Sequence, residues 1–141
     1  MKVTLRSAFN GVFNKVLTGL GVSSVLLFSA NGFAEGMNYS CSYTQASYTA
    51  PFMKQPNIRN CPEGRCSYQV QINGSMGTVN GVSGFGVDQS NSTIKLSRTA
   101  KDPVMGGMDT TVLTINKSDM TFTNVKTTTP SVTLTTQGTC N

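Results

Sequence analysis

The chain has 141 residues, with four cysteines, no histidine, and 11 Lys and Arg against 6 Asp and Glu. The absence of histidine excludes Ser-His-Asp and Cys-His catalysis and any metal site that needs an imidazole ligand. Lys2, Arg6 and Lys15 lie near the start, so the rest of the chain has 8 basic and 6 acidic residues, a net charge of +2. This small excess does not indicate the clustered basic face that nucleic acid needs, and we expect no nucleic-acid partner.

The first 34 residues have the organisation of an export signal. A basic start is followed by an apolar stretch over residues 16–28, and Gly32 and Ala34 place small residues where a signal peptidase requires them. The apolar stretch is shorter than the roughly 20 residues of a membrane-spanning helix. We therefore expect cleavage near Ala34, a periplasmic or secreted location and no transmembrane segment in the mature chain, with an uncleaved anchor as the alternative. Residues 35–141 then form a single all-β domain.

The four cysteines favour two disulfides, because an exported chain meets an oxidising environment. Cys41 and Cys140 each lie in an alternating segment, at positions that fall on the same face of the strand as the apolar residues. Both are therefore predicted to face the core and to bridge the first and last strands. Cys61 and Cys66 are close enough in sequence to close a tight turn. Three pairings are possible, and a four-cysteine zinc site and a redox-active pair are the competing interpretations.

Alternation of apolar and polar residues, typical of half-buried antiparallel strands, recurs through the mature chain. It is clearest over residues 37–43, 66–72, 93–97, 113–115, 120–122 and 132–140. Asn73-Gly74 and Asn80-Gly81 favour tight hairpin turns, which predicts a three-strand meander over residues 66–88. The predicted fold is all-β, a small antiparallel barrel or sandwich of about seven strands stapled by disulfides. A bridge between the first and last strands favours the barrel.

Two segments do not fit this pattern. Residues 44–65 contain three prolines and would be a long structureless loop, so we expect a missed edge strand over residues 46–52. Residues 99–109, with sequence TAKDPVMGGMD, are predicted to form a mobile, exposed loop.

No set of residues indicates a named chemistry, so the sequence predicts a non-enzymatic binding module without cofactor or metal. An enzyme would need an unrecognised Ser-Lys or carboxylate pair, and a structural or adhesive surface component is a further alternative. Loops on a rigid β-scaffold usually carry function, and the expected partner is a protein or a cell-envelope or glycan ligand. The candidate binding residues, from the clasped turn, the glycine-rich run and the Met-Gly-Gly-Met segment, are Arg59, Glu63, Arg65, Phe85, Met105 and Met108.

Tyr39-Ser40-Cys41 near the mature start and Cys140 almost at the end give a layout similar to that of periplasmic inhibitors of lysozyme. The inhibitory loop of that family resembles Ser-Gly-x-x-Tyr, and Ser83-Gly84 matches its first two positions, whereas the position of the tyrosine is occupied here by Val87. The family's core tryptophan has no counterpart, because the chain contains no tryptophan. The resemblance implies lysozyme inhibition as an alternative function.

Overall fold

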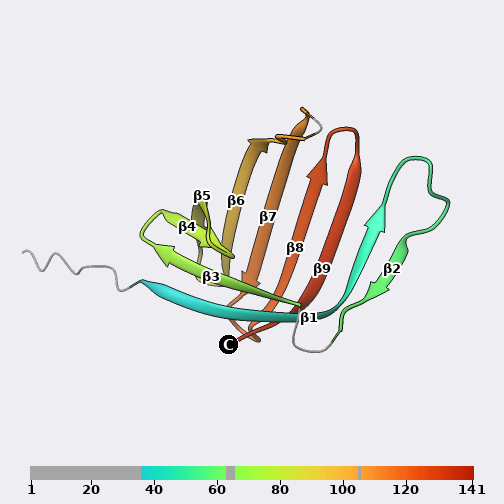
Figure 1. The fold of residues 1–141 in the computed structure, drawn as a ribbon. Coiled ribbons are helices and arrows are strands. Elements are labelled where there is room, and N and C mark those ends of the chain that lie inside the picture. The colour runs from blue at the N-terminus through green and yellow to red at the C-terminus, as the bar shows by residue number, and fades with distance from the viewer. Residues whose placement is uncertain (1–35, 63–65, 105) are drawn as a thin grey trace, which may run out of the picture. The chain divides into compact units, whose positions relative to one another are not determined.

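The computed structural model of the chain describes residues 36–62, 66–104 and 106–141, in which nine antiparallel strands form one sheet (Figure 1). In chain order these are β1 (Met37–Thr49), β2 (Asn57–Asn60), β3 (Ser67–Asn73), β4 (Met76–Val79), β5 (Val82–Gln89), β6 (Thr93–Lys101), β7 (Met108–Asn116), β8 (Thr121–Thr128) and β9 (Val132–Cys140). Pairing of β1 with β9 closes β1 and β3–β9 into an eight-stranded barrel, to which β2 is added. The predicted disulfide-stapled β-barrel is confirmed, although nine strands are present where about seven were expected.

Within the part of the chain that the structure describes, no helix has the length and apolarity to cross a membrane. The predicted export signal over residues 1–34 lies outside the described residues.

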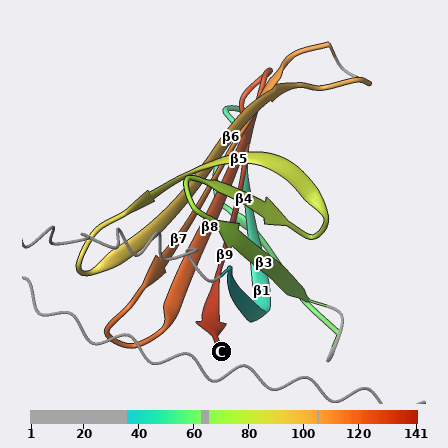
Figure 2. The ribbon, with the colours of Figure 1, turned by 90° about the vertical axis from the view of Figure 1, so that its left-hand side faces the viewer.

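The predicted meander is present as β3, β4 and β5, which pass in front of the longer strands in Figure 2. Asn80 and Gly81 both have positive φ, 50° and 77°, as the predicted hairpin turn requires. The turn between β3 and β4 lies one residue further along the chain than expected. Asn73 pairs with Met76, so the loop consists of Gly74 and the serine after it, and only the glycine has positive φ.

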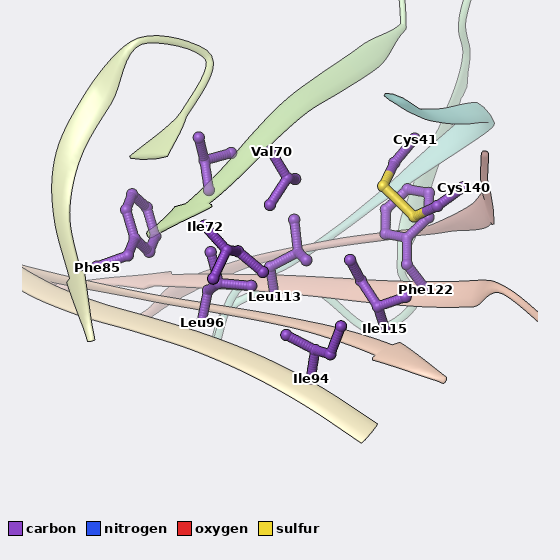
Figure 3. Packing of buried hydrophobic residues seen from close by; sticks show 11 residues of the cluster. Cys41, Val70, Ile72, Phe85, Ile94, Leu96, Leu113, Ile115, Phe122 and Cys140 are labelled. Carbon is purple, nitrogen blue, oxygen red and sulfur yellow. A yellow bond between two sulfur atoms is a disulfide. The ribbon is translucent and has the colours of Figure 1, made fainter. Parts of the chain in front are cut away.

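The core fills the barrel where the meander crosses it (Figure 3). Successive side chains of a strand point to opposite faces, so every second one points into the barrel. Among these, Leu96, Leu113 and Ile115 are completely buried. The other members of the cluster are Cys41, Val70, Ile72, Val79, Phe85, Ile94, Phe122 and Cys140. The part of the barrel that the meander crosses is therefore filled by its own side chains.

A β-bulge lets β1 run further than the sequence pattern predicted. Tyr43 pairs with Gly138 and Ala46 pairs with Thr136, so two residues of β1 face only Gln137 of β9. The extra residue changes the inward-facing positions from odd to even numbers. Regular alternation is lost at this point, which is why the expected separate edge strand over residues 46–52 is wrong: β1 continues to residue 49, and the additional strand is β2.

β2 and β3 lie end to end along β1, and the Cys61–Cys66 disulfide joins their adjoining ends. The Cys61 N–H donates to the Thr44 carbonyl at 2.7 Å, and the Cys66 carbonyl accepts from the Tyr43 N–H at 3.0 Å. Both cysteines thus continue the ladder on β1. We call the disulfide-bonded pair Cys61 and Cys66 the clasp.

Cys41 and Cys140 lie directly opposite each other on β1 and β9 and form the second disulfide (Figure 3). Both side chains belong to the core, as the parity of their strands predicted. Both predicted pairings are therefore confirmed. Two disulfides in a small β-domain are typical of extracellular or periplasmic proteins.

The segment 99–109 is more regular than predicted. β6 extends to Lys101 and β7 begins at Met108, with the two strands paired over this whole length. The connecting loop is therefore residues 102–107 only. The prediction failed because cross-strand pairing gives order to residues whose composition is typical of loops.

Candidate functional site

The barrel has two unlike halves, because the meander covers only part of the longer strands. β3 pairs with β1 only as far as Ser42, and β5 pairs with β6 only as far as Ser97. Beyond these points β1 and β6–β9 continue together, with β2 along one edge (Figures 1 and 2). We call this continuation the open half. The part crossed by the meander is the closed half. The three loops at the tip of the open half form the loop end. The loop end consists of residues 50–56, 102–107 and 129–131.

The inner face of the sheet becomes polar from the core toward the loop end. Across neighbouring strands, Leu113 pairs with Asn124, and Asn124 pairs with Thr136. Two residues further out on the same face, Thr111 pairs with Lys126. The apolar core is thus capped by hydrogen-bonding side chains, and charged side chains follow.

Tyr68 organises the polar cap. The Asn124 amide Nδ2 donates to the Tyr68 hydroxyl at 2.9 Å, and the same hydroxyl is 3.1 Å from the Thr136 Oγ1. Asn124 and Thr136 are only 4% and 1% exposed, and the Asn124 Oδ1 is buried without a hydrogen-bond partner in the described part of the chain. The Tyr68 ring stacks on Tyr43 at 5.2 Å and meets the Phe122 ring edge-on at 5.8 Å. The cap therefore depends on one hydroxyl group held by aromatic packing.

Tyr68→Phe is expected to lower the free energy of unfolding by about 1 to 3 kcal/mol, because it leaves the buried Asn124 amide with no hydrogen bond at either end. Urea unfolding measures the effect. Tyr39→Phe is the matched control, since the Tyr39 hydroxyl makes only a 3.5 Å contact with the Met37 sulfur. Equal losses in the two variants would contradict the role given to the Tyr68 hydroxyl.

Burial and the adjacent Tyr68 raise the pKa of Tyr43 from 10.0 to about 12. Because the folded state favours the neutral phenol, the contribution of Tyr43 to the free energy of unfolding is complete below pH 10 and is lost as the pH rises toward 12. Ultraviolet titration of tyrosinate in the folded protein should show a late-ionising component that Tyr43→Phe removes. An unchanged late component in Tyr43→Phe would contradict this assignment.

Two cations of the open half, Lys126 and Arg59, have partners on the sheet. The Lys126 ammonium is 2.8 Å from the Asp109 carboxylate, and these side chains are 42% and 16% exposed. The Arg59 guanidinium lies 5.4 Å from the centre of the Tyr48 ring, a cation–π contact that joins β2 to β1. The predicted binding residue Arg59 is therefore exposed in the open half, with its charge over an aromatic face.

The loop end presents apolar side chains to solvent. Phe52 is 85% exposed and Val104 is 86% exposed, and Met108 at the start of β7 is 49% exposed. Such exposure is unusual for a phenylalanine, which normally contributes to a core. These apolar residues are the feature of the loop end that needs an explanation.

Local hydrogen bonds shape the turns that contain the two most exposed apolar residues. The Met53 N–H donates to the Ala50 carbonyl at 2.9 Å and closes a turn with Phe52 at its corner. In the loop between β6 and β7 the Val104 N–H donates to the Asp102 carboxylate at 2.7 Å. The Thr129 hydroxyl donates to the Met108 carbonyl at 3.2 Å, which ties the loop 129–131 to the start of β7. The loop end is thus built from hydrogen-bonded turns.

The structure describes three of the six predicted binding residues, and two of these three lie in the open half. Arg59 and Met108 lie in the open half, whereas Glu63, Arg65 and Met105 lie outside the described residues. The prediction for Phe85 is corrected: its side chain is 4% exposed and belongs to the core, so it presents no surface for a ligand. The signal was available, because Phe85 alternates with glycines on either side in a way typical of an inward-facing strand residue.

The described residues contain no group of three or more Cys, Asp or Glu side chains placed to hold a metal ion. Comparison of the chain with protein-family models, with characterised proteins and with solved structures found no match. Functional inference therefore depends on the geometry of the open half and its loops.

Proposed function

We propose that the chain is an exported, non-enzymatic binding module that contacts its ligand through the loop end. The two disulfides support an oxidising location outside the cytoplasm. A sequence without histidine supports a binding role over most nucleophilic and metal-dependent chemistry.

The observation that carries the proposal is the high exposure of Phe52 and Val104, on two hydrogen-bonded turns at the same end of the sheet. The closed half is filled by its own core, so its interior offers little space for a ligand. Loops on a rigid β-scaffold are where binding residues usually lie. An apolar side chain held in water contributes to stability only if something covers it, which supports a partner at this end.

Chemical-shift perturbation in the exported protein tests the proposal. Lipid vesicles, soluble peptidoglycan fragments and purified envelope proteins are each titrated into labelled protein. Shifts confined to residues 50–56, 102–107 and 129–131 with one of these classes are the expected result. The proposal would be wrong if no class shifts these residues, or if shifts appear only in the closed half. Sedimentation of the free protein as a polymer would favour a structural role instead.

Lysozyme inhibition is a second candidate, supported by the position of Ser83 and Gly84. These two residues, which match the inhibitory loop of the similar family, are exposed on β5 and line a hollow of about 580 Å³ with Asn38 and Asn73. Addition of the protein should then slow lysis by lysozyme, and Ser83→Lys should abolish the effect. Unchanged lysis at saturating protein would exclude this function.

A further inference from the structure

We propose that the loop end binds the surface of a membrane containing anionic lipids, with Phe52, Val104 and Met108 entering the interfacial region and Lys54 and Lys101 near the lipid phosphates. This inference rests on the proposed binding function and names its ligand class.

The three loops reach the same end of the barrel. Thr49 at the end of β1 pairs with Thr133 at the start of β9, and Lys101 pairs with Met108. Gly107 packs directly against the backbone of Thr129, so the loops 102–107 and 129–131 are in contact. Figures 1 and 2 show these loops at one end of the sheet in both views. All three loops therefore lie at the same end of the strands.

Exposed apolar residues concentrate in the open half and its loops. Of the seven large apolar side chains that are exposed in the described residues, five are found there. They are Phe52, Ile58, Val104, Met108 and Val132. The remaining two belong to β4 and β5.

The charge of the described domain is also concentrated in the open half. Its five cations and two acids give a net charge of +3, whereas the two cations and two acids described in the closed half cancel. The open half contains Lys54, Arg59, Arg98, Lys101, Lys126, Asp102 and Asp109, and the closed half contains Lys95, Lys117, Asp88 and Asp119. Lys54 lies two residues from Phe52, and Lys101 lies three from Val104, with Asp102 between Lys101 and Val104. An anionic surface complements this arrangement.

The spacing of the tips favours a lipid surface over a protein groove. Phe52 and Val104 are highly exposed and lie in separate turns, the first between β1 and β2 and the second between β6 and β7. A protein partner would need a separate pocket for each tip, whereas the headgroup and acyl boundary of a bilayer is one continuous phase that accepts isolated apolar side chains. Basic residues near such a boundary add to binding through the negative surface potential of anionic lipid.

Vesicle sedimentation tests the inference with protein purified after export. The probes are phosphatidylcholine vesicles with and without phosphatidylglycerol. We expect binding only to the anionic vesicles and its loss at high salt, since salt screens surface charge. Phe52→Ser with Val104→Ser should lower the partition coefficient by about 100-fold, the effect of withdrawing two apolar side chains from the interface. Lys54→Gln with Lys101→Gln should lower it by about 30-fold.

Matched variants in the closed half serve as controls. Met76→Ser with Val82→Ser removes two exposed apolar side chains of β4 and β5, and Lys95→Gln with Lys117→Gln removes two cations. Both should bind anionic vesicles as the unsubstituted protein does. Every variant is compared in the same exported form, and thermal unfolding verifies that each is folded.

The possible outcomes separate this inference from the proposed function. Absence of binding to anionic vesicles, or equal binding by the loop variants and their controls, would overturn the lipid inference. Chemical shifts at the loop end with peptidoglycan or an envelope protein, and none with lipid, would overturn the lipid inference and leave the binding module in place. A loop end that responds to no class of ligand would overturn both.

Discussion

Replacement of both Cys41 and Cys140 with alanine is expected to lower the free energy of unfolding by about 5 kcal/mol. This disulfide closes a loop with a sequence separation of 99 residues, so its removal greatly increases the conformational freedom of the unfolded chain. Small domains are typically stable by only about 5 to 15 kcal/mol, so the disulfide supplies a third or more of the total. Circular dichroism during urea denaturation, with the unsubstituted protein measured in parallel, gives the difference.

The Cys61→Ala and Cys66→Ala double variant is the matched control. It also removes one disulfide, but the sequence separation is only 5 residues, and the same loop-entropy relation gives about 2 kcal/mol. The barrel should remain folded, because β2 and β3 keep their ladders on β1. Equal losses in the two double variants would show that the length of the closed loop does not determine the stabilisation.

Gly138→Ala is expected to destabilise the domain by about 3 kcal/mol or more, the upper range for forcing extra volume into a packed site. Gly138 lies opposite Tyr43 where β1 and β9 close the barrel. A methyl group at this position would overlap the carbonyl oxygen of Ser42, and backbone cannot move aside as a flexible side chain can. The closure between first and last strands therefore requires glycine for space.

Gly86→Ala on β5 is the control for this substitution. A methyl group there would come no closer than 3.9 Å to the Ser97 carbonyl oxygen, an ordinary van der Waals contact. Since alanine also loses less backbone freedom on folding, we expect Gly86→Ala to change stability by less than about 1 kcal/mol. Thermal unfolding of the two variants provides the comparison, and a similar melting temperature for both would contradict the steric argument.

Much of the barrel could be predicted because strand alternation is a local property of the sequence. The inward parity of Cys41 and Cys140 predicted their pairing, and that pairing predicted a closed barrel. Asn80-Gly81 predicted a hairpin, since both residues accept positive φ. The inward-facing pattern of each cysteine and the turn signal are both read from residues close together in sequence.

The features that were missed depend on contacts between distant segments. The bulge after Tyr43 changes the parity of β1, and only its pairing with Gly138 and Thr136 reveals it. β2 has four exposed residues and no alternation, so nothing in its sequence marks it as a strand. The loop end was predicted only in part. Residues 99–109, which include Val104, were predicted to be exposed, whereas Phe52 was assigned to an expected edge strand. The position of the loops at one end of the sheet follows from strand pairing that the structure alone shows.

The clasp separates the length of the peptide between Cys61 and Cys66 from the stability of the barrel. Cys61 and Cys66 each keep a backbone hydrogen bond to β1, so both ends of this peptide are fixed on the sheet. Peptide between these points can be lengthened or exchanged at a small cost in loop entropy, because each doubling of loop length adds only about 0.6 kcal/mol. The domain is thus a ready scaffold for display, in which a foreign peptide grafted between the two cysteines would be held at both ends without disturbing the core.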